Sequence, residues 1–205
     1  MTRLPVMTAG VPLARADMAV IMLHGRGATA ADILSLTDHL EQNDLAYVAP
    51  QAPGNSWYPN SFLAPLDQNE PALSEALALV GGLIESLATD GVTPERVVLL
   101  GFSQGGCLAL EYAARHARRY AAVVGLSAGL IGPQTAHRNY AGSLTGTPVF
   151  LGCGDMDGHI PLERVKESTK VLRGLGGEVT QRIYRGMGHA INDDELAQVR
   201  AMLRA

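Results

Sequence analysis

Short apolar runs alternate along this chain with longer segments in which hydrophobic residues recur at helical spacing. Runs of about five to seven residues rich in Val, Ile and Leu are typical of strands buried on both faces, as in parallel sheets. The alternation predicts an α/β fold, a mostly parallel sheet with crossover helices on both faces. The predicted strands are Met18–Leu23, Leu45–Ala49, Arg96–Phe102, Ala121–Ser127, Pro148–Cys153 and Val179–Tyr184. The predicted helices lie near residues 29–42, 70–89, 104–118, 161–174 and 192–204.

Composition narrows the class of protein. The chain has 205 residues, of which 47% are hydrophobic and 18% are charged. It is too apolar for a disordered chain and too weakly charged for a coiled coil, so we expect a single globular domain over residues 1–205. The formal net charge is −4. Because nucleic acids and anionic membrane surfaces attract basic proteins, we expect neither as a partner.

The N-terminal segment lacks the pattern of an export signal, because prolines and the charged residues Arg15 and Asp17 interrupt it. No apolar run approaches the roughly 18 residues that a membrane span requires, so we expect no stable membrane anchoring. Cys107 and Cys153 are too few for a disulfide framework and lack metal-ligand spacing. We therefore predict two buried thiols in a cytoplasmic protein.

One long irregular segment, residues 50–69, holds the densest group of aromatic residues, Trp57, Tyr58 and Phe62. Loops of this length inside compact domains usually serve a function. The three side chains either pack as a small core beneath the loop or form one wall of a substrate pocket. We favour the pocket wall.

The strongest chemical signal is the pentapeptide Gly101-Phe102-Ser103-Gln104-Gly105, which follows a predicted strand and opens a predicted helix. This is the context that a G-x-S-x-G nucleophile elbow requires. A sharp strand-to-helix turn projects the Ser103 hydroxyl, and Gly101 and Gly105 remove Cβ atoms that would collide there. The same turn points the backbone N–H of Gln104 at the place where a tetrahedral oxyanion would form.

A serine nucleophile needs a base and a group that orients the base, and elbow hydrolases carry them in the order Ser, Asp or Glu, His. Asp155 and Asp157 follow the predicted strand Pro148–Cys153, and His189 follows the last predicted strand. Both positions lie past the carboxyl ends of strands, where open α/β sheets place their sites. We predict His189 as the base, and the spacing leaves both aspartates open as its partner. A metal site formed by Asp155, Asp157, His159 and His189 is a weaker alternative, because its spacing is not diagnostic.

Two further histidines adjoin this predicted site. His24 lies in the turn His24-Gly25-Arg26 after the first predicted strand, where a histidine braces the loop and the residue after the His-Gly pair donates a second backbone N–H to the oxyanion. We assign that donor to the backbone of Arg26. His159 is two residues from Asp157, so we predict a pocket residue rather than the base.

Together these motifs resemble the phospholipase/carboxylesterase family of small α/β-hydrolases, which includes acyl-protein thioesterases and lysophospholipases. In that family the second Asp of a Gly-Asp-x-Asp loop is catalytic, which implies Asp157. Gly158 stands where the family usually has Pro, and Arg26 occupies a position that is often apolar in the thioesterases. The resemblance covers nearly the whole chain and rests on Leu23-His24-Gly25, Ala49-Pro50-Gln51-Ala52-Pro53, Trp57, Gly101–Gly106, Gly154–Pro161 and Gly186–His189.

The resemblance and the motifs predict a serine carboxylesterase that hydrolyses short- to medium-chain esters through an acyl-enzyme on Ser103. The stretch from Trp57 to Phe62 looks more like bacterial carboxylesterases than eukaryotic thioesterases. Alternatives are a lysophospholipase or thioesterase acting on longer acyl chains, or a non-catalytic binding protein with this fold. We expect a small-molecule ester substrate, no metal, no organic cofactor and no separate lid domain. The resemblance also makes a homodimer plausible.

Overall fold

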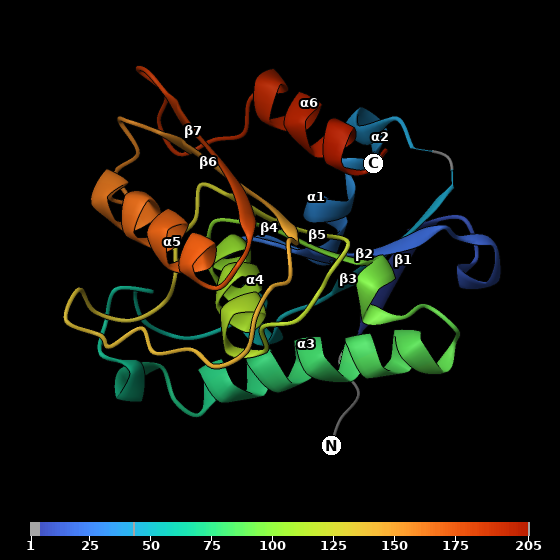
Figure 1. Cartoon of the computed structure of the whole chain (residues 1–205), viewed down its shortest axis with the longest axis horizontal. Coiled ribbons are helices and arrows are strands. Elements are labelled where there is room, and N and C mark those ends of the chain that lie inside the picture. The colour runs from blue at the N-terminus through green and yellow to red at the C-terminus, as the bar shows by residue number, and fades with distance from the viewer. Residues whose placement is uncertain (1–4, 43, 205) are drawn as a thin grey trace.

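The computed structural model describes residues 5–42 and 44–204. Within them seven strands form one sheet in the order β1-β3-β2-β4-β5-β6-β7 (Figure 1). β1 pairs with β3 antiparallel, whereas the other neighbouring strands pair in parallel. The strands are β1 (Val6–Gly10), β2 (Met18–Leu23), β3 (Leu45–Pro50), β4 (Val97–Phe102), β5 (Ala122–Leu126), β6 (Pro148–Gly154) and β7 (Glu178–Tyr184). The predicted mostly parallel α/β sheet is confirmed.

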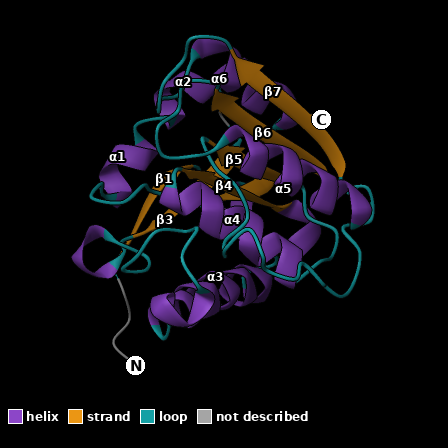
Figure 2. Ribbon diagram, turned by 90° about the vertical axis from the view of Figure 1, so that its left-hand side faces the viewer, coloured by secondary structure: helices purple, strands orange, loops and turns teal. Residues whose placement is uncertain are grey.

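Helices cover both faces of this sheet, as predicted (Figure 2). Alternate residues of β2 enter different cores: Ile21 packs with residues of α3, α4 and α5, whereas Val20 packs with residues of α1, α2 and α6. This is the two-sided burial expected of a central parallel strand. The helices are α1 (Ala30–Leu34), α2 (Thr37–Leu40), α3 (Ala72–Thr89), α4 (Gln104–Arg115), α5 (Leu162–Gly174) and α6 (Asp193–Met202).

The strand β1 was not among the predicted elements. It lies at the edge of the sheet, and four of its five residues are exposed. An edge strand of this kind needs no continuous apolar run, so its sequence carries little hydrophobic signal. The antiparallel pairing with β3 is what makes Val6–Gly10 a strand.

The single helix predicted near residues 29–42 is wrong in detail, because two short helices occupy this segment. Thr29 caps α1 through a reciprocal capping box with Asp32, which agrees with a start at this position. The first helix ends after Leu34, and Glu41 adopts a left-handed conformation after α2. The helix predicted over residues 104–118 ends at Arg115.

Helix α3 is long and apolar enough, by length and composition alone, to cross a membrane, and among the described residues it is the one such helix. The core helix of a globular protein passes the same test. Six of its residues, including Leu73, Val80 and Ile84, are buried. All six belong to the hydrophobic cluster that packs against the sheet. We therefore interpret α3 as a core helix of the fold.

The parallel strands direct the chain segments that follow them to one edge of the sheet. The turns after β2, β4, β6 and β7 carry the residues selected from the sequence. Because β2 and β4 are neighbours, and because β5 alone separates β4 from β6, these turns converge.

Candidate active site

Ser103 lies between β4 and α4 in a strained backbone conformation, with φ 54° and ψ −121°. The neighbouring glycines permit this turn. A Cβ on Gly101 would lie 2.3 Å from the carbonyl of Gly105, and a Cβ on Gly105 would lie 2.1 Å from the Leu23 carbonyl oxygen. Positive φ is costly for a residue other than glycine and is found at sites where the turn serves a function. The geometry is that of a nucleophile elbow.

The structure brings Ser103, His189 and Asp157 into one hydrogen-bonded chain. His189 Nε2 lies 2.8 Å from Ser103 Oγ, and His189 Nδ1 lies 2.8 Å from Asp157 Oδ2. The carboxylate can only accept, so Nδ1 carries the proton and Nε2 is left to accept from the serine hydroxyl. The Asp157 side chain is fully buried, whereas 20% of the His189 side chain is exposed. The His189 ring can therefore be approached by a solute.

Asp157 is held as a carboxylate by several donors. Its Oδ1 accepts from the backbone N–H groups of His159 at 2.8 Å and Ile160 at 3.0 Å, and its Oδ2 also faces the Cys153 thiol at 3.6 Å. Burial raises the pKa of Asp157, but the hydrogen bonds from His189 and the two backbone N–H groups outweigh burial, and its pKa falls below the usual value. The group remains ionised near neutrality, as an orienting carboxylate must.

The two aspartates that the spacing left open have different positions. Asp155 is exposed, and its carboxylate accepts from the backbone N–H of Gly186 at 2.6 Å. It therefore joins the loop after β6 to the loop that carries His189. Asp157 alone of the two contacts the His189 ring. His159 is exposed, and its ring lies edge-on to that of His189 with centroids 4.8 Å apart, so it borders the site.

The predicted oxyanion donors flank Ser103. Gln104 is the first residue of α4, so its backbone N–H has no acceptor within the helix. The turn after β2 packs directly against the elbow, because a Cβ on Gly25 would lie 3.4 Å from Ser103 Cβ. This places Arg26 in the turn next to the nucleophile, where its backbone N–H was expected.

His24 is fully buried beneath this turn. Its Nδ1 lies 2.8 Å from the Gly25 carbonyl oxygen, and its Nε2 accepts from the backbone N–H of Ala52 at 3.1 Å. Since the carbonyl can only accept, the ring is neutral with its proton on Nδ1. Burial lowers the pKa of His24, which agrees with this neutral form. It joins the turn after β2 to the loop after β3, the bracing position predicted for it.

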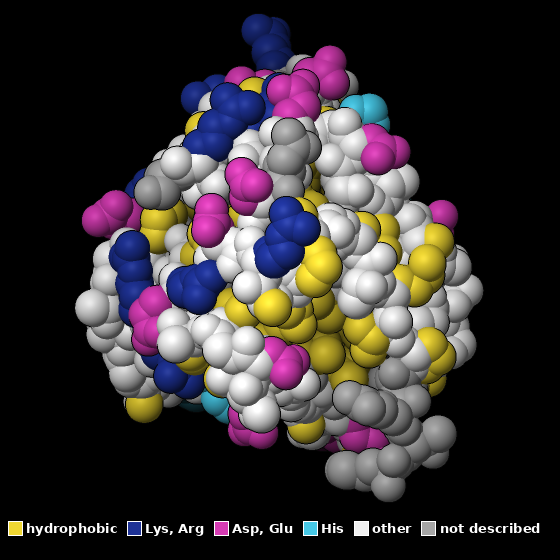
Figure 3. All heavy atoms as spheres, turned by 90° about the vertical axis from the view of Figure 1, so that its right-hand side faces the viewer, with side chains coloured by type: hydrophobic (Ala, Val, Ile, Leu, Met, Phe, Trp, Pro, Cys, Tyr) yellow, Lys and Arg dark blue, Asp and Glu magenta, His cyan; other side chains and the backbone are white. Residues whose placement is uncertain are grey.

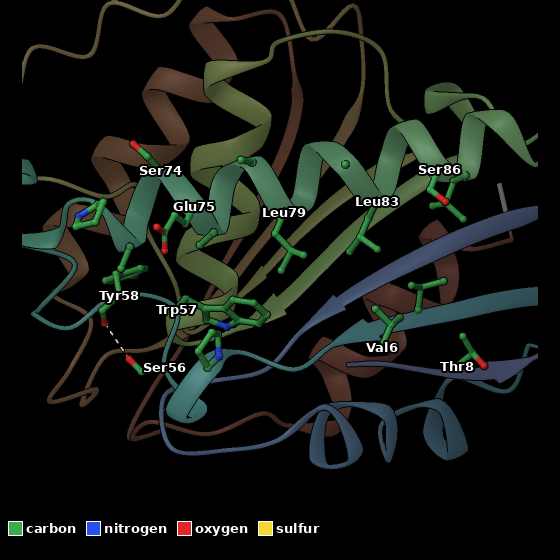
Figure 4. A pocket seen from close by; sticks show the side chains of 18 of the residues that line it. Val6, Thr8, Ser56, Trp57, Tyr58, Ser74, Glu75, Leu79, Leu83 and Ser86 are labelled. Carbon is green, nitrogen blue, oxygen red and sulfur yellow. Dashed lines mark hydrogen bonds between the residues drawn. The ribbon is translucent and has the colours of Figure 1, made fainter. Parts of the chain in front are cut away.

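The three aromatic residues of the loop after β3 differ in what they border. Trp57 and Tyr58 line an apolar groove of about 1600 Å³ between α3 and β1. In Figure 4 the Trp57 ring lies below Leu79, on the side of the groove toward Val6, and Figure 3 shows hydrophobic side chains gathered in a hollow on one face. Phe62 does not line this groove. It is 7% exposed, belongs to the core cluster, and lies beneath the guanidinium of Arg164.

The groove is distinct from the serine site, because neither Ser103 nor His189 lines it. Trp57 contacts both regions: its Nε1–H donates to the His24 carbonyl oxygen at 2.8 Å, and its ring borders the groove. The expectation that these aromatic residues form a wall of the substrate pocket stays a prediction: Trp57 and Tyr58 line this groove and Phe62 does not. All three side chains belong to one hydrophobic cluster, and composition alone does not say which of them also line a groove.

Sequence reasoning missed the side-chain roles of Arg26 and Gln104. Both residues were selected for their backbone N–H groups, yet their side chains donate to carbonyl oxygens of residues 58–60. The sequence did contain a signal for the role of the Arg26 side chain, because an arginine at a position that is often apolar in the thioesterases needs a polar partner. The partners are backbone carbonyls, which every residue has, so their identity could not be read from the sequence.

The comparisons with known proteins agree with this geometry. The family model described as Phospholipase/Carboxylesterase matches residues 11–205. Acyl-protein thioesterase 1 of Saccharomyces cerevisiae is 26% identical over 223 aligned residues, which cover 92% of each chain. Acyl-protein thioesterase 1 of Gibberella zeae is 37% identical over 131 residues, which cover 60% of this chain. That second match spans only 53% of the relative's length.

Among solved structures, a phospholipase/carboxylesterase from Dyadobacter fermentans DSM 18053 superimposes with a TM-score of 0.95 and is 46% identical, covering 99% of this chain and 97% of that one. The esterase PE8 superimposes with a TM-score of 0.82 at 26% identity, covering 99% of both chains. Taken with the family match over residues 11–205, these likenesses establish the class of enzyme. The chain belongs to the phospholipase/carboxylesterase family and is a serine hydrolase with the α/β-hydrolase fold.

Proposed function

We propose that this enzyme hydrolyses short- to medium-chain carboxylic esters through an acyl-enzyme on Ser103. The observation that carries the proposal is the chain of two 2.8 Å contacts from Ser103 Oγ through the His189 ring to Asp157. A serine hydroxyl is a weak nucleophile near neutral pH, and this arrangement supplies both a base and a group that orients it.

In the proposed mechanism His189 Nε2 accepts the Ser103 proton as Oγ attacks the ester carbonyl carbon. The tetrahedral oxyanion accepts from the backbone N–H groups of Arg26 and Gln104, each worth roughly 3 kcal/mol in the transition state. His189 then gives its proton to the departing alcohol, leaving an acyl group on Ser103. Water that loses a proton to the same nitrogen hydrolyses the acyl-enzyme, and Asp157 stabilises the imidazolium in both steps.

The preference for short chains is supported by the separation between the serine site and the apolar groove. The Trp57 ring borders the groove, and its hydrogen bond to His24 ties it to the buried floor of the site. Because Trp57 contacts His24 on one side and the groove on the other, we expect a long acyl chain carried on Ser103 to need a rearrangement of this side chain before it enters the groove. A short acyl chain needs no such change.

A thioesterase acting on longer acyl chains is the second candidate, favoured by the thioesterase relatives named above. Thioesters and oxygen esters pass through the same oxyanion, so the triad does not separate them. Rates on acetyl, butyryl and palmitoyl esters and their matching thioesters do. We expect kcat/KM to be highest for the acetyl or butyryl oxygen ester. A maximum on the palmitoyl thioester would contradict the proposed specificity.

We further propose that the enzyme acts in the cytoplasm on a small-molecule ester. Its two cysteines, Cys107 and Cys153, are both free and buried. Free thiols are typical of proteins in reducing compartments. Fractionation of cells that express the protein tests this, since recovery with exported or membrane material would contradict the cytoplasmic location.

A further inference from the structure

The two predicted oxyanion donors belong to different parts of the fold. Arg26 lies in the turn after β2, and Gln104 begins α4 after β4. Their backbone N–H groups must be held within a few tenths of an ångström of their working positions, because a donor that is misplaced loses most of its transition-state stabilisation. The turn that carries Arg26 is exposed at Arg26 and Gly27, so its position needs a support.

The side chains of both residues converge on one acceptor, the carbonyl oxygen of Tyr58. Gln104 Nε2 donates to it at 2.7 Å and Arg26 Nη2 donates to it at 2.9 Å. Ser56 Oγ donates to the same oxygen at 2.8 Å, the contact drawn as a dashed line in Figure 4. The Tyr58 carbonyl therefore bridges the side chains of the two oxyanion residues.

Each side chain also has a second attachment to the same loop. Gln104 Oε1 accepts from the backbone N–H of Trp57 at 3.0 Å. The Arg26 guanidinium donates to the carbonyl oxygens of Pro59 at 2.7 Å and Asn60 at 2.5 Å. The bonds from Arg26 are charge-assisted and use the planar fork of donors that arginine alone possesses.

The loop is itself anchored, so it can serve as a fixed support. Trp57 is buried and donates through Nε1 to the His24 carbonyl oxygen. At the other end, the backbone N–H of Asn60 donates at 2.8 Å to the side chain of Asn69, which is fully buried. Movement of residues 57–60 would break contacts at both ends.

We infer that the side chains of Arg26 and Gln104 are positioning residues, which hold the two halves of the oxyanion hole in register through the shared Tyr58 carbonyl. This inference rests on the proposed function, because it assigns a role within the same acyl-transfer reaction. The guanidinium touches backbone carbonyls rather than the reacting atoms. It acts on the rate by fixing where the Arg26 backbone N–H points.

The test compares Arg26→Ala, Arg26→Lys and Gln104→Ala, using p-nitrophenyl butyrate as the substrate. We expect kcat to fall by about 10- to 100-fold in Arg26→Ala, less than the loss of an oxyanion donor itself, while KM changes little. Arg26→Lys should recover only part of this loss, because an ammonium group cannot reach three carbonyls in one plane. Free guanidinium ion at millimolar concentration should partly restore kcat in Arg26→Ala, and ammonium ion should not.

A double variant tests whether both side chains act through the same carbonyl. If they do, Arg26→Ala combined with Gln104→Ala should lose less activity than the product of the two single losses. Independent, fully multiplicative losses would contradict the shared role.

Arg96→Ala is the matched control. The Arg96 guanidinium also donates to three carbonyl oxygens, those of Asp17, Ala16 and Gly91, but near the amino ends of β2 and β4, away from the site. We expect Arg96→Ala to lower the free energy of unfolding and leave kcat within about two-fold of wild type.

Three results would overturn the inference. If Arg26→Ala changes stability but not kcat, its role is merely structural. If KM rises while kcat is kept, the guanidinium binds substrate. If the wild-type protein neither turns over the ester nor reacts at Ser103 with a fluorophosphonate, the proposed function fails as well. An active wild type with an unaffected Arg26→Ala variant refutes the positioning role alone.

Discussion

The two oxygens of the Asp157 carboxylate face different partners. Oδ1 binds the backbone of its own loop, and Oδ2 binds His189. The first set of bonds fixes the carboxylate, and the second fixes the tautomer of the imidazole. Asp155, two residues earlier, accepts one hydrogen bond from the described part of the chain, from the backbone N–H of Gly186. We therefore expect substitutions of these two aspartates to have different effects on the kinetics.

Replacement of Asp157 by Asn should lower kcat roughly 10⁴-fold, because the amide can donate to Nδ1 and so favour the wrong tautomer of His189. Asp155→Asn is its matched control. An asparagine oxygen at position 155 can still accept from Gly186, so we expect kcat within a few-fold of wild type. Steady-state kinetics on a short p-nitrophenyl ester measure both, and a larger loss in Asp155→Asn would transfer the orienting role to Asp155.

The residues of this site differ in how far they could be predicted from sequence. Ser103 and His189 are recognisable because a strand-to-helix turn and a histidine after the last strand leave short local signals. The choice of Asp157 over Asp155 needed the family resemblance, since spacing treats the two alike. The bonds from Arg26 to the Tyr58, Pro59 and Asn60 carbonyls depend on the path of an irregular loop, which no periodicity encodes.

At the scale of elements, the elbow depends on a close approach between the start of α4 and the ends of β2 and β4. Gly105 lies at this contact, where a Cβ would be 2.1 Å from the Leu23 carbonyl oxygen. Backbone atoms on both sides leave little room for relaxation. Gly82, in the middle of α3, has no described atom within 4 Å of its would-be Cβ apart from its chain neighbours and its own helix backbone. Close packing therefore requires glycine at position 105, whereas no neighbouring element requires it at position 82.

Gly105→Ala should lower the free energy of unfolding by about 3 kcal/mol or more and abolish activity, because α4 must shift away from β2. Gly82→Ala should instead raise the free energy of unfolding by up to about 1 kcal/mol, since alanine is the better helix former in an exposed position. Urea unfolding of both variants measures the two effects. Equal effects would contradict the close packing described at the elbow.

Elements were predicted well where they are buried and poorly where they are exposed. The six predicted strands correspond to β2 through β7, whose apolar runs reflect burial. The missed strand β1 is mostly exposed, and it is specified by its pairing with β3. The segment 29–42 has helical composition throughout, but the turn at Ser35 and Leu36 divides it, and tertiary contacts rather than propensity decide where it breaks.

At the scale of the whole molecule, stability should depend on pH through one buried acid. Glu195 is fully buried near the start of α6; its Oε2 accepts from the Asn192 backbone N–H, and its Oε1 has no hydrogen-bond partner among the described residues. Burial raises the pKa of this carboxyl from 4.5 to about 7, and nearby Asp194 adds to the rise. The Cys153 thiol and the Tyr184 hydroxyl are also near enough to interact with its charge.

Because the pKa is higher in the folded state, Glu195 favours folding while it is protonated, and this advantage is lost as pH rises through about 7. Between pH 5.5 and pH 8.5 this titration should lower the free energy of unfolding by about 2 kcal/mol. Glu195→Gln keeps an acceptor for Asn192 without the charge. We expect the variant to exceed wild type in free energy of unfolding by about 2 kcal/mol more at pH 8.5 than at pH 5.5. A difference that does not change with pH would show that Glu195 does not titrate in this range.

The molecule as a whole gathers side chains from distant parts of the chain at one edge of its sheet, and in the proposed mechanism Ser103 becomes the acyl carrier there. The most direct measurement is mass spectrometry of the protein after reaction with a fluorophosphonate, alongside Ser103→Ala. We expect one adduct per chain, on the peptide that contains Ser103, with loss of esterase activity in step with labelling. Ser103→Ala should show neither adduct nor turnover. An adduct on another residue, or a Ser103→Ala variant that still hydrolyses the ester at the wild-type rate, would contradict the proposed mechanism.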